Sequence, residues 1–103
     1  MGLSKKKRIT VNADVNYVVN SAYQAVTQCG WKVKSTGPGF IKASTGMSMS
    51  SWGETITIQV QPVGNIANVE ISSKANWQLI DWGKNDQNIR NFINNLSKYV
   101  VIM

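Results

Sequence analysis

The stretch TITIQVQPVGNIANVEISS, residues 55–73, decides the fold of this chain. It contains two segments of alternating apolar and polar residues around Gly64-Asn65, a dipeptide typical of a two-residue hairpin turn. With that dipeptide at the centre of the turn, the expected opposite pairs are Val60 with Val69, Ile58 with Ile71, and Gln59 with Glu70. Each pair is apolar on both strands or polar on both strands. Because a slip of one residue would turn a whole strand over, this agreement predicts an antiparallel hairpin with one apolar face.

Two further turns extend this hairpin toward the N-terminus. Segments 31–36 and 40–45 flank the Gly-Pro-Gly sequence at 37–39, which is typical of a turn between strands. The expected pairs there are Thr36 with Phe40, Val33 with Ala43, and Lys34 with Lys42. A two-residue turn at Trp52-Gly53 would require a positive φ at Gly53. Its expected pairs are Met49 with Ile56, Met47 with Ile58, and Thr45 with Val60. All three turns place apolar side chains on the same face, so the sequence predicts a four-stranded meander.

The segments on either side of the meander predict one more strand and two helices. Residues 5–12 alternate and predict a first strand that can run antiparallel beside the fifth. The segment from Asp14 to Cys29 has apolar residues at helical spacing, and Gly30 is placed as a C-terminal stop. The final helix is expected to have Asp81 as its N-cap and Trp82 on its apolar face. The other apolar residues of that face are Ile89, Phe92, Ile93, Leu96, Tyr99 and Val100.

The predicted fold is α+β, with the order β-α-β-β-β-β-α. A five-stranded antiparallel sheet in the order 2-3-4-5-1, with two helices packed on its apolar face, buries these apolar residues. Residues 1–103 form one domain, with 1–4 as a flexible end. This architecture is similar to the TATA-binding-protein-like and helix-grip folds. The motifs SWGE at 51–54 and DWGKN at 81–85 resemble a family of small bacterial proteins without an assigned activity, so the resemblance implies no catalytic residues.

The composition argues against an enzyme. The chain has no histidine, and its carboxylates are Asp14, Glu54, Glu70, Asp81 and Asp86. This excludes histidine-based triads and most general-base chemistry at neutral pH. Cys29 is the single cysteine, which excludes an internal disulfide and makes a zinc site implausible. It lies on the apolar stripe of the first predicted helix, so we expect it to be a small core residue. We therefore expect no catalytic residues, no metal site and no cofactor.

Targeting signals are also missing from the sequence. No apolar run approaches the ~20 residues that a membrane-spanning helix requires. The basic N-terminus is not followed by the apolar stretch of a secretory signal. A cytoplasmic location is the expectation.

Basic residues form two candidate anion-binding groups. The formal net charge of +6 favours anionic partners, although it also suits a protein that is simply soluble. The predicted polar sheet face carries Arg8, Lys32, Lys34, Lys42 and Lys74, with Glu70 as the opposing acid. Repulsion between Lys34 and Lys42 would be relieved by a bound anion, or by lysines that bend away into solvent. The second group is Lys5, Lys6, Lys7 and Arg8. If each contacts one phosphate, binding to duplex DNA should follow a log–log salt slope of about −3.6, and we expect weak, non-specific binding.

The four tryptophans are predicted to lie at one end of the domain, together with the basic run 5–8. Strand directions bring Trp31, Trp52, Trp77 and Trp82 to that end. The indoles could close the open end of the sheet and helix layers, with each N–H hydrogen-bonded. The alternative is a basic, tryptophan-rich docking patch for a protein, a second copy of the chain or an anionic membrane surface.

These observations favour a non-enzymatic binding or interaction domain. Two alternatives remain open: a carrier of a small apolar ligand between sheet and helices, and a non-specific binder of nucleic acid or anionic surfaces. The carrier hypothesis rests on analogy with helix-grip relatives. Against it, Phe92, Ile93 and Leu96 predict a filled core. Against base readout of nucleic acid, Phe40 is the single aromatic residue expected to point outward from the strands.

Overall fold

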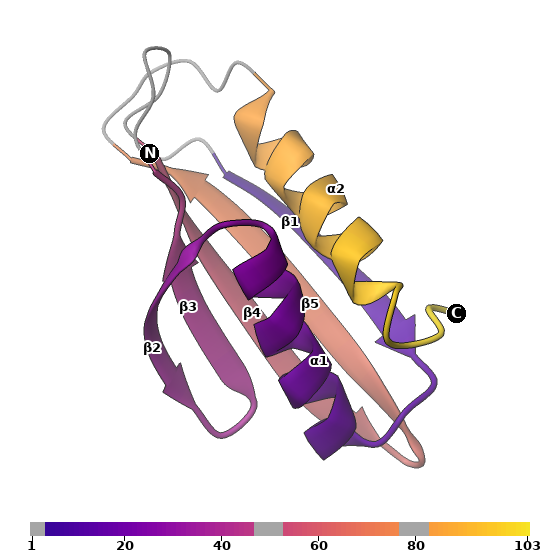
Figure 1. Ribbon diagram of the computed structural model, residues 1–103. Helices are drawn as coiled ribbons and strands as arrows, with labels where there is room; N and C mark the ends of the chain where they lie inside the picture. Colours follow the sequence, from indigo (N-terminus) through magenta and orange to yellow (C-terminus); the bar gives the residue numbers. More distant parts are fainter. Residues whose placement is uncertain (1–3, 47–52, 77–82) are drawn as a thin grey trace.

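The computed structural model describes residues 4–46, 53–76 and 83–103 of the chain. Within these ranges the elements follow the predicted order (Figure 1). They are β1 (Ser4–Val11), α1 (Val15–Gln28), β2 (Lys32–Gly37), β3 (Phe40–Ser44), β4 (Glu54–Val63), β5 (Ile66–Ala75) and α2 (Lys84–Leu96). Ser4 therefore already belongs to β1.

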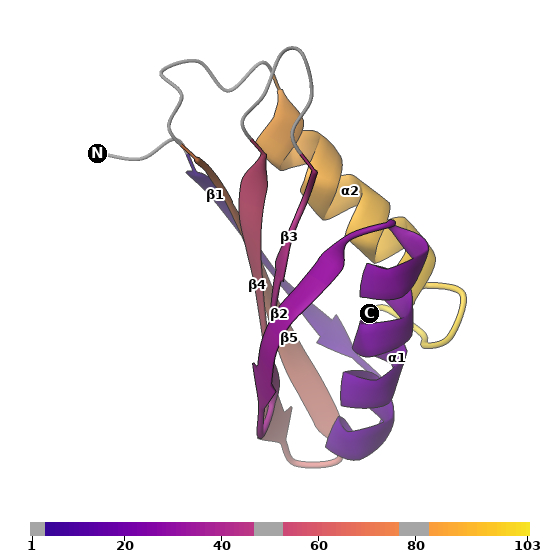
Figure 2. The same cartoon turned by 60° about the vertical axis from the view of Figure 1, so that its left-hand side comes forward.

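The strands form one antiparallel sheet in the order β1-β5-β4-β3-β2, which is the predicted order read from the other edge. Both helices lie on the same face of the sheet, and no helix in the described ranges covers the other face (Figures 1 and 2). The predicted fold class and topology are confirmed. This two-layer arrangement leaves one sheet face open to solvent.

The β4–β5 hairpin has the register that its turn predicts. Val60 pairs with Val69 and Ile58 with Ile71. β1 runs antiparallel beside β5, with Ile9 opposite Val69. The inner face of the central strands is therefore lined by β-branched residues, which pack well on a pleated surface.

The predicted register between β3 and β4 is wrong. Ile58 pairs with Ile41 rather than with residue 47, and the pairing ends where the Thr45 N–H donates to the Glu54 carbonyl oxygen at 3.0 Å. A two-residue turn would have left Glu54 beside the turn, whereas the residue is only 3% exposed. The displacement is an even number of positions, so each strand keeps its apolar face inward. Met47, Met49 and Trp52 lie outside the described residues.

Gly53 has the predicted positive φ, at 91°, but for a different reason. A Cβ at this position would lie 2.9 Å from the Thr45 carbonyl oxygen, so glycine lets two backbone segments approach closely. The residue marks the point where β4 meets the end of β3.

The predicted pairing of Lys34 with Lys42 is also wrong. Gly37, one residue away from the expected Thr36, pairs with Phe40, and glycine permits this pairing because a Cβ at residue 37 would lie 2.3 Å from the Phe40 ring. A register shift between Val33 and Ser35 then makes Lys34 an extra residue, and Ser35 stands opposite Lys42. This β-bulge returns Val33 to the inner face opposite Ala43, as predicted.

Helix α1 matches its predicted boundaries closely. The Asp14 carboxylate accepts a hydrogen bond from the Asn16 N–H at 3.0 Å, which caps the N-terminus. Gly30 follows the helix with a φ of 78°, as expected of a stop residue. Val18, Ala22 and Val26 are fully buried against the sheet.

Helix α2 begins later than predicted. Its N-cap is Gly83, in a left-handed conformation with φ of 75° and no side-chain capping bond, so Asp81 is not the N-cap. Asp81 and Trp82 themselves lie outside the described residues. Phe92 and Leu96 are fully buried, and Ile93 and Tyr99 are partly buried against the core, so the predicted apolar stripe is confirmed. No helix in the described part of the chain is long and apolar enough to span a membrane.

Candidate functional site

The open face of the sheet consists almost entirely of polar and basic side chains. Opposed residues in an antiparallel sheet share a face, so the pairings define rows that cross the strands. From the α2-start end the first four rows are Ser4-Lys74-Thr55-Ser44-Lys32, Lys6-Ser72-Thr57-Lys42-Ser35, Arg8-Glu70-Gln59-Phe40-Gly37 and Thr10-Asn68-Gln61, and the apolar pair Ile66-Val63 follows beside the β4–β5 turn. We call the cationic members the basic face: Lys6, Arg8, Lys32, Lys42 and Lys74.

Glu70 is the acid in these rows, and two cations of β1 already neutralise it. The Arg8 guanidinium donates to the Glu70 carboxylate at 2.8 Å, and the Lys6 Nζ lies 3.7 Å from its other oxygen. In the described part of the chain, Lys32, Lys42 and Lys74 form no ion pair. These three lysines carry uncompensated charge among the serine and threonine hydroxyls of the first two rows.

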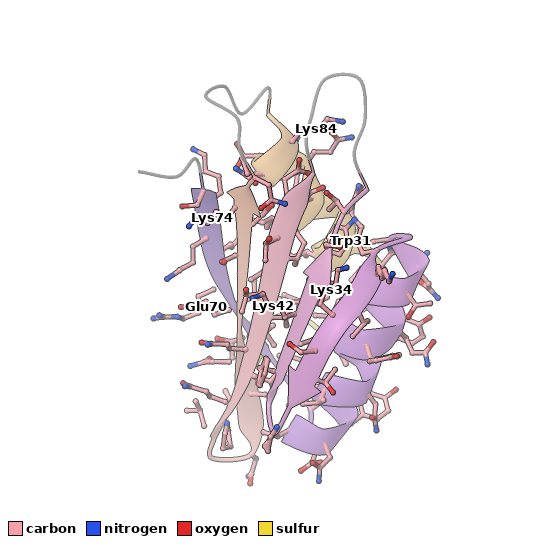
Figure 3. The ribbon with its side chains drawn as sticks, turned by 90° about the vertical axis from the view of Figure 1, so that its left-hand side faces the viewer. Trp31, Lys34, Lys42, Glu70, Lys74 and Lys84 are labelled. Carbon is pink, nitrogen blue, oxygen red and sulfur yellow. The ribbon has the colours of Figure 1, made fainter. Side chains whose placement is uncertain are left out.

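The structure places the predicted basic residues on different faces of the sheet. Strand alternation splits the run 5–8: Lys6 and Arg8 lie on the basic face, whereas Lys5 and Lys7 pair with Ser73 and Ile71 on the inner side. All four cations are exposed, and they project from both faces of this edge strand. Of the other predicted cations, Lys32 and Lys42 lie on the basic face, and Lys34 is exposed at the bulge on the strand beside Lys42 (Figure 3).

The ion pair at Glu70 makes a prediction about pH. Hydrogen bonding from Arg8, with a smaller contribution from the charge of Lys6, holds the pKa of Glu70 below its ordinary value. A lowered pKa means that ionised Glu70 stabilises the folded state. This stabilisation is present above the pKa that Glu70 has in the unfolded chain, and it is lost as the pH falls through the pKa that Glu70 has in the folded chain. We expect an NMR titration to show a low Glu70 pKa that rises toward the ordinary value in Arg8→Ala. Arg90→Ala, which removes an exposed cation from α2, should leave it unchanged. An Arg8→Ala variant with the native Glu70 pKa would contradict this assignment.

The tryptophan hypothesis is not tested, because Trp52, Trp77 and Trp82 lie outside the described residues. Trp31 is half-buried and packs against the core. Gly53 follows Trp52 and Asn76 precedes Trp77, and the Asn76 N–H donates to the Gly53 carbonyl oxygen at 3.0 Å. These two positions lie at the end of the sheet where β1 and α2 begin (Figure 1). The clustering of the four indoles stays a prediction.

A buried polar cluster at the same end was not predicted from the sequence. Its members, here called the polar junction, are Glu54, Ser73, Asn85 and Asn88, and all are buried. The Asn88 amide donates to Glu54 Oε1 at 2.7 Å and to Ser73 Oγ at 3.2 Å. The Ser73 hydroxyl donates to Asn85 Oδ1 at 2.7 Å. The polar junction thus joins Glu54 of the SWGE motif to Asn85 of the DWGKN motif, from opposite layers of the fold.

One sequence signal could have revealed the polar junction. Asn85 and Asn88 precede Ile89, Phe92 and Leu96 at helical spacing, so they continue the buried stripe of α2. On the sheet, Glu54 and Ser73 occupy inward positions next to Ile56 and Ile71. Buried polar residues need hydrogen-bond partners. Here the asparagines of α2 and the polar residues of the sheet are hydrogen-bonded to each other.

The chemistry of the polar junction is structural. Thr45 also binds Glu54, since its hydroxyl accepts from the Glu54 N–H at 2.7 Å and donates to Oε1 at 3.2 Å. Among the described residues, every buried side-chain nitrogen and oxygen has a hydrogen-bond partner. No three described metal-ligating side chains lie close enough to hold an ion. A saturated cluster with one carboxyl group provides neither a catalytic pair nor a metal site.

Cys29 behaves as a packed thiol. It is half-buried at the end of α1, and the Asn95 amide donates to its Sγ at 3.3 Å. Burial raises the pKa of the Cys29 thiol, although the Asn95 hydrogen bond and the charge of Lys98 act in the opposite direction. Since the thiolate is the reactive form, this environment disfavours a nucleophile.

Comparison with known proteins identifies the fold. No protein-family model and no curated protein matches the sequence. Solved structures match along almost the whole chain. The Aha1 dimer from Colwellia psychrerythraea has a TM-score of 0.64 and 15% identity, covering 96% of this chain and 97% of that one. TTHA0849 from Thermus thermophilus has a TM-score of 0.57 and 8% identity, with coverages of 94% and 96%. Ara h 8.0201 has a TM-score of 0.56 and 8% identity, with coverages of 96% and 97%. At these identities the likeness establishes a helix-grip type of architecture and no activity.

Proposed function

We propose that this protein is a non-enzymatic binding domain whose basic face binds the phosphate backbone of duplex nucleic acid without sequence preference. One observation carries the proposal: Lys32, Lys42 and Lys74 stand without ion pairs, in the described part of the chain, on a sheet face that no described helix covers. Like charges gathered on one face repel each other, and a polyanion removes that repulsion. The face therefore has charge complementarity to a polyphosphate.

The residue types between the lysines favour nucleic acid over a membrane. Phosphate oxygens in nucleic acid complexes accept hydrogen bonds from lysine and arginine and also from serine, threonine, asparagine and glutamine. The four rows contain these residue types almost throughout. Adsorption to an anionic membrane instead uses tryptophan, phenylalanine or leucine that enters the interface. On the described sheet face, Phe40 packs against Gly37, and the apolar pair Val63 and Ile66 lies beside the β4–β5 turn, away from the rows that hold the three lysines.

The same face favours a duplex over a single strand. Proteins that hold single strands stack bases on aromatic side chains, and the strand centres of this face carry hydroxyl and amide groups instead. Lys32 and Lys74 stand three strands apart in one row, and Lys6 and Lys42 do so in the next. With strands spaced by about 4.8 Å, each pair spans roughly 14 Å across the sheet. That span suits several phosphates of a rigid polymer rather than one small anion.

The absence of an enzymatic role is part of the proposal. It is supported by the lack of histidine in the sequence and by the saturated hydrogen bonding of Glu54. Glu70, the acid on the open face, is bound by Arg8. Glu54 and Glu70 lie on opposite faces of the sheet, so they do not form the pair of carboxyl groups that general acid–base hydrolysis commonly requires.

Salt dependence tests the proposal directly. If Lys32, Lys42 and Lys74 each neutralise one phosphate, the log–log slope for a mixed-sequence DNA duplex should be about −2.7, or roughly 40-fold weaker binding at 200 mM than at 50 mM salt. The double variant Lys42→Glu/Lys74→Glu should bind at least about tenfold more weakly at 50 mM salt, with a slope reduced to about −0.9. Fluorescence anisotropy measures both quantities.

A matched control separates a local surface from overall charge. Arg90→Glu/Lys98→Glu makes the same change in net charge on exposed positions of the helix layer. It should keep the native slope and an affinity within about twofold. Equal weakening in both double variants would show a long-range charge effect and reject the basic face. Binding to phosphatidylserine vesicles that depends on Lys42 and Lys74, with no binding to the duplex, would reject nucleic acid as the partner.

A further inference from the structure

A second feature, at the opposite end of the domain, is a groove beside the β2–β3 turn. Its volume is about 550 Å³, within the range of small-molecule sites. The start of α1 and the β2–β3 turn lie at this end, away from the start of α2 (Figures 1 and 2). We call it the turn groove. It is lined by Val15, Asn16, Val19 and Asn20 of α1, by the turn 37–39, and by Val60 and Pro62 of β4.

The groove exists because the residues around it are small. Gly37 and Gly39 bring no side chains, and Gly39 sits so close to β4 that a Cβ there would lie 2.8 Å from the Val60 carbonyl oxygen. Phe40, next to the turn, pairs with Gln59 on the opposite face of the sheet. On α1, valines rather than larger side chains face the turn. The groove opens to solvent on one side, where Asn16, Asn20 and Pro38 are exposed.

The lining specifies the chemistry of an occupant. The lining side chains carry no charge, although the chain has a net charge of +6. Val15 and Val19 lie one turn apart and give the helical wall an apolar ridge, beside which Asn16 and Asn20 give an amide ridge. Both asparagine side chains lack hydrogen-bond partners within the described residues. A matching ligand is neutral, with an apolar body and a hydrogen-bonding group on one edge.

We infer that the turn groove is a binding site for a small neutral amphiphile, whose apolar body packs on Val15, Val19 and Val60 and whose polar edge meets the Asn16 and Asn20 amides. This site is separate from the basic face, because it lies on the helix side of the sheet. It also lies away from the space between the sheet and α2, which Phe92 and Leu96 fill.

The probe for this site is N-phenyl-1-naphthylamine, a neutral ring system with a single N–H. We expect saturable binding with blue-shifted fluorescence, and shifts of amide NMR signals at residues 15–20 and 37–39. Val19→Trp, which fills the groove, should weaken binding at least tenfold. Asn20→Ala, which removes one hydrogen-bonding group, should weaken it about fivefold. Lys42→Glu/Lys74→Glu should leave the affinity unchanged.

The control is Asn94→Trp, which adds the same indole at an exposed position of α2. Circular dichroism verifies that each variant is folded, and Val15→Phe replaces Val19→Trp if the latter is not. Absence of saturable binding by the native chain overturns the inference. So does equal weakening by the groove-filling variant and Asn94→Trp, or a set of NMR shifts confined to residues outside the groove.

Discussion

Replacing Phe92 with alanine is expected to lower the free energy of unfolding by about 3–5 kcal/mol. Phe92 is fully buried on α2 and is among the largest fully buried side chains of the described residues. Truncation removes its apolar contacts and leaves a cavity between helix and sheet that close-packed neighbours can only partly fill. For a domain of this size the loss corresponds to a midpoint at least about 12 °C lower.

Urea unfolding followed by circular dichroism measures this loss. Asn91→Ala is the matched control, because Asn91 is exposed on the adjacent position of α2. It should change stability by less than about 0.7 kcal/mol, in the stabilising direction, since alanine is the better helix former. Similar effects of the two substitutions would contradict the packing of α2 on the sheet.

Replacing Asn88 with leucine is expected to cost about 2–4 kcal/mol, despite the similar shape of the two side chains. The substitution removes the donor that binds Glu54 Oε1 at 2.7 Å and Ser73 Oγ at 3.2 Å. Glu54 is only 3% exposed, so water cannot easily replace that donor. Oε1 then keeps only the longer hydrogen bond from the Thr45 hydroxyl, at 3.2 Å. Removing the shorter bond from a buried carboxyl group costs more than a hydrogen bond contributes at an exposed site.

A double-mutant cycle isolates the interaction from general effects of leucine. Glu54→Gln, Asn88→Leu and the double variant should show a coupling energy of about 1 kcal/mol or more, because the residues share one network. Asn91→Leu on the exposed side of α2 should change stability by less than about 0.5 kcal/mol. If Asn88→Leu is as mild as Asn91→Leu, the polar junction does not join the two motifs energetically.

The sequence by itself determined the topology. The β4–β5 register follows from one tight turn, where the chain returns directly and alternation on both strands must agree, as Val60 with Val69 shows. The strand order and the helix-bearing face follow from the same alternation, carried through β3 and β1. The polarity of the open face, including Lys32 and Lys42, was predictable for the same reason.

Tertiary structure decided the registers that alternation leaves open. A shift by an even number of residues keeps every side chain on its face, so the pattern could not tell Ile41 from residue 47 as the partner of Ile58. At the β2–β3 turn Phe40 pairs with Gly37, which shifts the register by one residue from the prediction. The bulge at Lys34 compensates for this shift and keeps Val33 on the inner face. These are contacts between backbones and side chains that no local pattern encodes.

Tertiary structure also decided the polar junction and the turn groove. Glu54 and Asn88 are 34 residues apart in the sequence. Each is a polar residue on an apolar face, and its hydrogen-bond partner comes from the other layer of the fold. The turn groove likewise lies between α1, the turn 37–39 and β4, which only the folded chain brings together. Local alternation determines which face of the sheet a residue occupies. Hydrogen-bond partners and grooves form only where segments that are distant in the sequence come together.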